Sequence, residues 1–281
     1  AALAAEDVKG GFGCGWDLIL PAGRGRAVWC ALVGAGARAI GLCEARAIAL
    51  HSREAFFPCD WPDTAAGLTW QHAEAVERRR VHGSKPASRR PNHDKLGVRF
   101  PFAPDWGVLL GNGATTDQAG APPPVCVLRG EPAAHWLVRK RGGASTGSTL
   151  AESVPLAMRQ DIRRHLVRVT LHLCQKGRAK PQAEIRAPTQ QLAAAWRRDR
   201  THAGVASGEE EDGVARHPLG FVTNGSFDEL RGHAVALGFC AAGDLFSLPV
   251  ETAGGAVLVA VRNASSRHFR LALASVCCER H

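Results

Sequence analysis

Two apolar blocks near opposite ends of the chain constrain its fold most strongly. One spans residues 15–21 (GWDLILP) and the other spans residues 220–227 (GFVTNGSF), with arginine-rich sequence between them. With 281 residues and 45% hydrophobic content, the chain can bury a core as one large domain or as two ordinary ones. The separation of the blocks predicts two folding units joined by positively charged connections.

The C-terminal part carries a strand pattern. Residues 217–281 hold short apolar runs at 220–223, 234–240, 256–261 and 269–273, separated by expected turns at Asn224-Gly225, Gly243 and Gly254-Gly255. This spacing predicts a small antiparallel sheet or barrel. Further upstream, apolar and polar residues alternate over 167–174, which predicts a half-buried strand. Residues 183–187 are expected to pair back onto that strand as a hairpin.

The N-terminal part mixes strand and helix signals. Residues 16–20 predict a short strand, and residues 37–51 have apolar spacing close to the helical period. Asp63 or Thr64 can cap a helix that runs to about Arg80, whereas the glycines and prolines of residues 77–99 indicate mostly loop. Residues 125–128 are a further strand candidate.

Residues 111–124, rich in Gly, Thr and Pro, are the best candidate for a domain boundary. We expect a first module over 1–112 and a C-terminal module over 118–281. The second module divides into a basic strand and hairpin segment, 118–216, and the barrel strands, 217–281. The predicted fold class is α+β, in which a mixed α/β first module packs on a C-terminal antiparallel β module.

Positive charge dominates the chain and points to an acidic partner. Lys and Arg exceed Asp and Glu by 35 − 26 = 9, and the isoelectric point is near 9.4. Such a balance favours nucleic acid or an anionic membrane surface, although a merely solvated surface also fits. The longest apolar runs, 27–35 and 256–261, fall short of the roughly 20 residues of a membrane span. We therefore expect a nucleic-acid partner and no membrane.

The cations gather in clusters that predict a phosphate-binding surface. Arg side chains bind phosphate through a planar fork, and each neutralised phosphate releases counterions. The chain contains no Tyr and no aromatic RNA-recognition motif, so recognition is expected through backbone and shape. The predicted RNA-binding residues are Arg78, Arg79, Arg80, Lys85, Arg89, Arg90, Lys95, Arg139, Lys140, Arg141, Lys176, Arg178 and Lys180.

Motifs of small-molecule enzymes are incomplete. Residues 34–39 match the G-x-G-x-x-A dinucleotide fingerprint, but no convincing second strand ends in an acidic residue at the required distance. Residues 142–149 lack the Gly-Lys-Ser/Thr ending of a phosphate-binding loop, and no G-x-S-x-G or H-E-x-x-H pattern occurs. His172 and Cys174 share one face of a strand, where a structural role is expected. No catalytic residue and no cofactor is predicted.

The cysteines indicate neither a disulfide framework nor a metal site. Nine cysteines, an odd number without any Cys-x-x-Cys pair, favour buried thiols in a reducing compartment. Cys277, Cys278 and His281 would need a second ligand pair to hold zinc, so no metal is expected. The start shows no pattern of a secretory signal, and its first residue is not Met.

Several motifs together resemble one family. The N-terminal ones are Gly15–Pro21, Trp29, Ala31-Leu32, Gly41–Glu44, Phe57–Thr64, Lys95–Gly97, Pro101-Phe102 and Trp106. The later ones are Val167–Gly177, Pro181, Gly220–Phe227, Arg231-Gly232, Leu237–Phe239 and Val261–Asn263. In this order they resemble the large protein subunit (the Pop-one family) of eukaryotic ribonuclease P and RNase MRP, over its middle and C-terminal domains.

The resemblance implies a non-catalytic scaffold in the nucleus and largely in the nucleolus. Such a protein would hold ribonuclease P RNA or RNase MRP RNA, together with other protein subunits, and would contact precursor tRNA only indirectly. The RNA, with Mg²⁺, would remove the 5′ leader of precursor tRNA or process precursor ribosomal RNA.

The C-terminal block is also similar to the barrel of the glycine-cleavage T-protein, a folate-dependent aminomethyltransferase. The alternative function is therefore a folate-dependent enzyme or folate-binding protein, with Asp228, Glu229 or Asp244 as the acid that orients the pterin.

Overall fold

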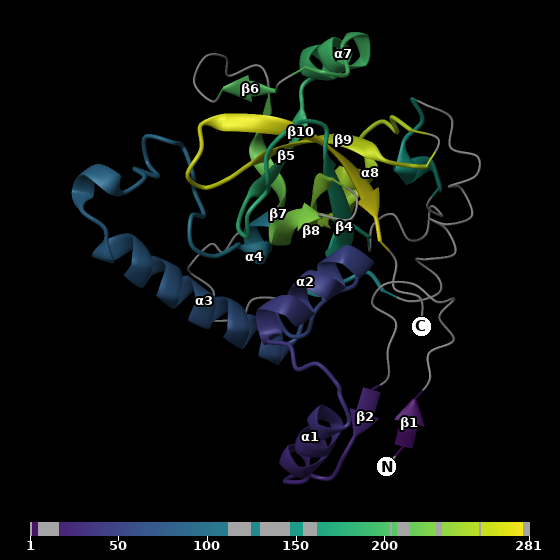
Figure 1. Cartoon of the computed structure of the whole chain (residues 1–281). Coiled ribbons are helices and arrows are strands. Elements are labelled where there is room, and N and C mark those ends of the chain that lie inside the picture. Colours follow the sequence, from purple (N-terminus) through teal and green to yellow (C-terminus); the bar gives the residue numbers. More distant parts are fainter. Residues whose placement is uncertain are drawn as a thin grey trace, which may run out of the picture. The chain divides into compact units, whose positions relative to one another are not determined.

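The computed structural model describes residues 2–4, 17–111, 125–129, 147–153, 162–202, 204–206, 214–228, 232–252 and 254–277 (Figure 1). The chain forms two compact units, Ala1–Glu54 and Ala55–His281. The predicted boundary between 112 and 118 lies outside the described residues. Within the described ranges, every helix is too short or too polar to span a bilayer.

The first unit contains a two-stranded antiparallel sheet and two helices. Strand β1 (Ala2–Ala4) pairs with β2 (Asp17–Ile19), which confirms the short strand predicted around residues 16–20. The apolar run that precedes the G-x-G-x-x-A pattern is not a strand but helix α1 (Gly25–Gly34). Helix α2 (Leu42–Ser52) confirms the predicted helix but begins later, after Gly41. A dinucleotide fingerprint needs a strand before its glycines, so the structure removes this interpretation.

The second unit begins with helix α3 (Ala65–Ser84), whose start follows the predicted cap. Thr64 Oγ1 accepts a hydrogen bond from the Gly67 backbone N–H at 3.0 Å, which satisfies one of the free amides of the first turn. The helix continues to Ser84, beyond its predicted end near Arg80, so residues 81–84 are helical and do not belong to the expected loop. The short 3₁₀ helix η1 (Ala87–Arg89) and helix α4 (Trp106–Leu109) follow.

Six antiparallel strands close into a barrel. The order around it is β4–β8–β7–β5–β9–β10, and β10 pairs with β4 to complete the ring. The strands are β4 (His165–Leu173), β5 (Glu184–Pro188), β7 (Val214–Asp228), β8 (His233–Ala241), β9 (Val257–Arg262) and β10 (His268–Val276). Two short strands extend the sheet, β3 (Cys126–Val127) beside β4 and β6 (Val205–Ala206) beside β10. The predicted α+β class with a C-terminal barrel is confirmed.

Apolar side chains fill the barrel and two layers cover parts of its outside. Val169, Ile185, Val222 and Val259 belong to the inner cluster. On one outer face Trp106 packs edge-on against Phe221 and Phe239, with ring centroids 5.8 and 6.1 Å apart. On another, helix α7 (Gln190–Arg198) buries Leu192 and Trp196. The helical elements η2 (Leu150–Ser153) and α8 (Ala242–Phe246) complete this unit.

Three details of the sheet differ from the sequence prediction. β4 is buried on both faces along most of its length, including Arg168 and Thr170, so it is not half-buried. β5 pairs with β7 and β9, and not with β4 as a hairpin. Asn224-Gly225 lies inside β7 and makes no turn, while Gly243 lies in α8. At Gly225 a Cβ atom would sit 2.3 Å from the Ala179 carbonyl oxygen, so glycine serves close packing there.

Candidate nucleic-acid interface

The last turns of α3 present the first predicted cations. Arg78 is half-buried; its guanidinium donates to the Phe102 carbonyl oxygen at 3.0 Å and to Glu74 at 2.9 Å. Arg79 is exposed and stacks over the Phe102 ring, 5.9 Å from its centroid. Arg80 is exposed and forms a fork with Glu77, and this hydrogen bonding holds the pKa of the Glu77 carboxyl below its usual range. Arg78 therefore anchors the helix, whereas Arg79 and Arg80 face solvent.

The segment after α3 contains four predicted cations that divide into two kinds. Arg90 Nε donates to the Lys85 carbonyl oxygen at 2.6 Å, and its Nη2 donates to that of Gly83. These carbonyls end α3, so Arg90 caps the helix. Lys85, Arg89 and Lys95 are exposed, and none of them forms an ion pair with another described residue.

The loop between β4 and β5 holds the second exposed group: Lys176, Arg178 and Lys180. Asn263 fixes this loop, because its Oδ1 accepts from the Lys180 backbone N–H at 2.8 Å and its Nδ2 donates to the Arg178 carbonyl oxygen at 2.9 Å. The backbone of the loop is therefore held, while its cationic side chains remain in solvent.

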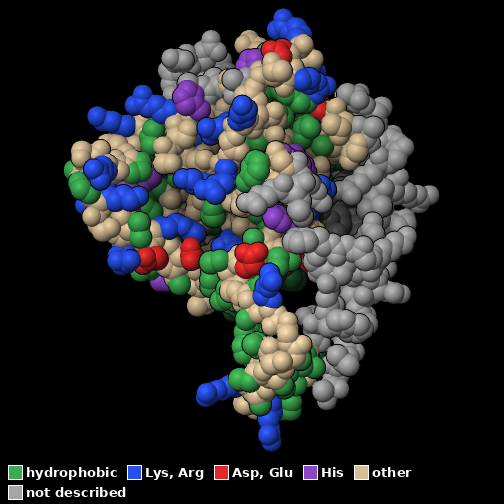
Figure 2. Space-filling model, in the orientation of Figure 1, with side chains coloured by type: hydrophobic (Ala, Val, Ile, Leu, Met, Phe, Trp, Pro, Cys, Tyr) green, Lys and Arg blue, Asp and Glu red, His purple; other side chains and the backbone are tan. Residues whose placement is uncertain are grey.

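The two basic segments meet at the turn between β9 and β10. His93 Nδ1 donates to the Ala264 carbonyl oxygen at 3.2 Å, next to the residue that holds the 178–180 loop. In Figure 1 this turn lies beside the segment that follows α3, and Figure 2 shows many Lys and Arg side chains on the same side of the molecule. Cations from positions near 95 and near 178 thus belong to one region of the second unit. The third predicted group, Arg139, Lys140 and Arg141, lies outside the described residues.

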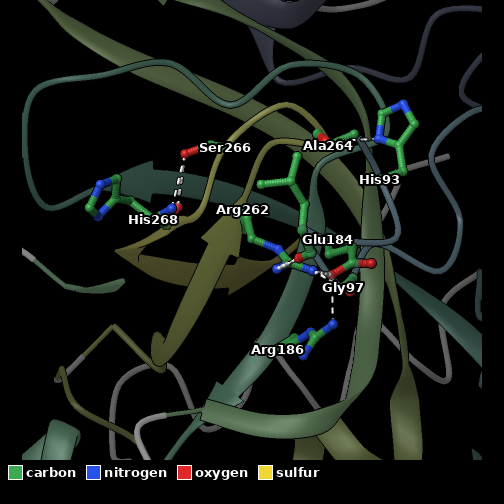
Figure 3. Close-up of polar contacts among 9 residues, drawn as sticks. His93, Gly97, Glu184, Arg186, Arg262, Ala264, Ser266 and His268 are labelled. Atoms are coloured by element: carbon green, nitrogen blue, oxygen red, sulfur yellow. Dashed lines mark hydrogen bonds and ion pairs between the residues drawn. The ribbon is translucent and has the colours of Figure 1, made fainter. Parts of the chain in front are cut away.

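A buried ion cluster underlies this meeting point (Figure 3). Arg262 Nη2 donates to Glu184 Oε2 at 2.8 Å, and Arg186 Nη2 donates to the same oxygen at 2.8 Å. The side chains of Arg262 and Glu184 are only 2% and 1% exposed. Burial lowers the pKa of Arg262 from its ordinary value, and the neighbouring Glu184 opposes this shift. Arg262 also lies over the Phe269 ring, 4.7 Å from its centroid.

The sequence prediction did not assign roles to Arg262, Asn263 or Glu184. The signal that could have found Arg262 is its place at the end of the run VLVAVR, where a charge follows five apolar residues of a buried strand. A charge in that position needs a partner, which suggests a search for a carboxylate on another apolar strand.

Thiols, metal-ligand types and the acids considered for folate bear on the enzymatic alternatives. Burial raises the pKa of the Cys174 and Cys240 thiols, which is opposite to what a nucleophile requires. No three His, Cys, Asp or Glu side chains in the described part gather to hold a metal ion. Of the acids considered for folate, Asp228 is buried, Glu229 lies outside the described residues, and Asp244 borders a hollow of about 400 Å³ that Arg163 and Leu110 also line. Among the described residues, the cluster inside the barrel consists of buried apolar side chains.

Two protein-family models match this chain. A family model described as the POPLD (NUC188) domain matches residues 15–106, and one described as the POP1 C-terminal domain matches residues 207–278. The chain belongs to the POP1 family. The first match covers β2 through to the start of α4, and the second covers β7–β10. Strands β4 and β5 of the POP1-family barrel lie between the two matches.

Curated relatives carry the name Ribonucleases P/MRP protein subunit POP1. The Homo sapiens protein is 34% identical over 115 residues, which are 41% of this chain and 11% of that protein. The Arabidopsis thaliana protein is 34% identical over 95 residues, 34% of this chain and 11% of its own length. The Schizosaccharomyces pombe protein is 35% identical over 104 residues, 34% of this chain and 14% of its own length. The matched stretches are thus a small part of each relative.

Proposed function

We propose that this POP1-family chain is a non-catalytic, RNA-binding subunit of ribonuclease P or RNase MRP. It binds the backbone of ribonuclease P RNA or RNase MRP RNA through the exposed cations around the β9–β10 turn. In this proposal the RNA performs the cleavage, so the protein supports 5′-leader removal from precursor tRNA and the processing of precursor ribosomal RNA. Its place is the nucleus, including the nucleolus, beside other protein subunits of the particle.

One observation carries the proposal: two basic segments far apart in the sequence are tied to the same turn. Lys95 lies in the segment anchored through His93, and Arg178 and Lys180 lie in the loop anchored through Asn263. Exposed cations without carboxylate partners are free to neutralise phosphates, and each neutralised phosphate adds to the salt dependence of binding. The names of the relatives support RNA of this particle as the polyanion.

The predicted residues take graded roles in this proposal. Lys85, Arg89, Lys95, Lys176, Arg178 and Lys180 are the phosphate contacts, because they are exposed and unpaired among the described residues. Arg79 and Arg80 contribute at the rim, where Arg80 exchanges Glu77 for a phosphate. Arg78 and Arg90 support the fold through their hydrogen bonds to backbone carbonyls. The proposed modules are 1–112 and 118–281, and contacts from residues 96–106 of the first complete the core of the second.

The test measures affinity for a ribonuclease P RNA transcript as a function of KCl concentration. The variant Lys95→Gln/Arg178→Gln/Lys180→Gln removes three cations of the proposed surface. The slope of log affinity against log salt should fall by about 0.9 for each phosphate that is no longer neutralised, hence by up to about 2.7. The matched control Arg163→Gln/Arg164→Gln/Arg198→Gln removes the same charge from other exposed sites and should change the slope far less.

Equal slopes for the two triple variants would refute the proposed surface, because only the net charge would then matter. A titration with reduced folate tests the alternative enzyme class in parallel. Tight folate binding by a chain that does not bind the transcript would overturn the RNA-binding function altogether.

A further inference from the structure

Three consecutive residues at the end of β9 tie both basic segments to the barrel. Arg262 Nη1 donates to the Leu96 carbonyl oxygen at 2.7 Å, and Nη2 donates to that of Gly97 at 2.9 Å. Asn263 holds the backbone of Arg178 and Lys180. The Ala264 carbonyl accepts from His93, as Figure 3 shows together with the Arg262 contacts.

A buried guanidinium is an unfavourable choice for a contact whose only role is to stabilise the fold. Charges that leave water need good geometry and full pairing, and apolar replacements of similar volume often support a fold equally well. Arg262 is 2% exposed, yet its planar group spans Glu184 on one strand and two adjacent carbonyls on another segment. Such a fork fixes relative orientation better than an apolar contact does.

The fixed backbone carries the exposed cations. Residues 92–98 form a compact turn, in which the backbone N–H groups of Leu96, Gly97 and Val98 donate to the carbonyls of Asn92, Asp94 and His93. Lys95 projects from this turn into solvent, while Arg178 and Lys180 project from the other loop. When two cationic groups are held at a fixed spacing, a ligand whose phosphates match that spacing binds without further ordering cost.

We propose that Arg262 and Asn263 are positioning residues that set the spacing between Lys95 and the Arg178–Lys180 loop, so that the surface selects folded RNA over flexible single-stranded RNA. This inference rests on the proposed RNA-binding function. Folded RNA presents phosphates from two backbone segments at a set distance, whereas a flexible strand adapts to cations at any spacing.

The first experiment compares two RNAs, the ribonuclease P RNA transcript and an unstructured uridine-only strand, with the full chain. Asn263→Ala removes both hydrogen bonds to the 178–180 loop from a partly exposed position. Affinity for the transcript should fall about tenfold, while affinity for the uridine strand should stay unchanged. Ser266→Ala is the matched control in the same turn, since Ser266 Oγ bonds only to the His268 backbone among the described residues, and it should alter neither affinity.

The second experiment needs no RNA. Arg262→Lys keeps the charge but cannot reach both carbonyls and Glu184, so amide hydrogen exchange at Leu96, Gly97 and Val98 should accelerate. The same variant should lose affinity for the transcript selectively. Circular dichroism confirms that each variant is folded, and Asn263→Ala decides the matter if Arg262→Lys does not fold.

The possible failures are distinguishable. An equal loss of affinity for both RNAs, or no loss in either folded variant, overturns the positioning role while leaving RNA binding intact. Unchanged exchange in a folded Arg262→Lys variant overturns it as well. A wild-type chain that binds neither RNA in a salt-dependent manner overturns the proposed function and with it the selectivity inferred here.

Discussion

The substitution Glu184→Gln tests how much the buried ion cluster contributes to stability. Glu184 Oε2 accepts from Arg262 and Arg186, each at 2.8 Å, and its side chain is 1% exposed. Hydrogen bonds to charged groups contribute about 1.5–3 kcal/mol each, so the removal of two such bonds amounts to about 3–6 kcal/mol. Gln retains a neutral acceptor, and Arg186, whose side chain is 14% exposed, can turn toward water. We therefore expect a loss of about 3–4 kcal/mol, within the range for removing one partner of a buried pair.

Urea unfolding followed by circular dichroism measures this loss. With a slope of about 3 kcal/mol per molar urea for a chain of this size, the midpoint should fall by about 1 M. Glu251→Gln is the matched control, because the Glu251 side chain is also 1% exposed but its partner Arg197 is 42% exposed. Arg197 can regain water when the charge is removed, so the control should cost only about 1–2 kcal/mol.

Two outcomes would refute the reasoning. If Glu184→Gln and Glu251→Gln lower the urea midpoint equally, the burial of the arginine partner does not determine the loss of stability. If Glu184→Gln lowers the free energy of unfolding by less than about 1 kcal/mol, the charge of Glu184 is not needed to compensate the buried Arg262.

Three further predictions concern the second unit. Gly67→Ala should destabilise α3 by about 2 kcal/mol or more, because the new Cβ would lie 1.8 Å from the Trp61 carbonyl oxygen. Gly83→Ala lies in open space on the same helix and should stabilise the chain by up to about 1 kcal/mol. Urea unfolding measures both changes. Burial lowers the pKa of His93 in the folded chain below its ordinary 6.5. Neutral His93 therefore stabilises the fold above pH 6.5, and this stabilisation should be lost as the pH falls through the lower pKa of the folded state. The urea midpoints of wild type and His93→Gln should differ at pH 7.5 and converge toward pH 5.5. The fragment 118–281 lacks Trp106 and the carbonyls that Arg262 binds, so it should show no cooperative unfolding and rapid proteolysis, unlike the fragment 55–281.

The sequence predicted those helices and strands that short-range residue patterns determine. The Thr64 cap, the helix after it and the strands at 234–240, 256–261 and 269–273 follow from residue type and period alone, and the structure confirms them. The basic segments were visible for the same reason, since a cluster of cations is a property of a short stretch. Their meeting at one turn was not visible, because it depends on which strands pair.

Strand pairing and burial of charge depend on contacts far apart in the sequence. β5 was expected to return to β4, its neighbour in the chain, but it lies between β7 and β9, where Glu184 faces Arg262 in the β5–β9 register. Asn224-Gly225 has the composition of a hairpin turn, yet both residues lie inside β7 and pair with Leu237 and Ala236 of β8. In each case a tertiary contact decided against a local preference.

The stretch between the two family matches completes the second unit. β4 closes the barrel by pairing with β10, and β5 supplies Glu184, the carboxylate that compensates Arg262. Neither strand belongs to residues 15–106 or 207–278, so neither matched segment contains all strands of the barrel or all partners of the ion cluster. Arg262 in turn binds the carbonyls of residues 96 and 97. This one side chain therefore connects the first matched segment, the intervening strand β5 and the second matched segment. A basic surface built across such a junction keeps its geometry only while all three parts are folded together.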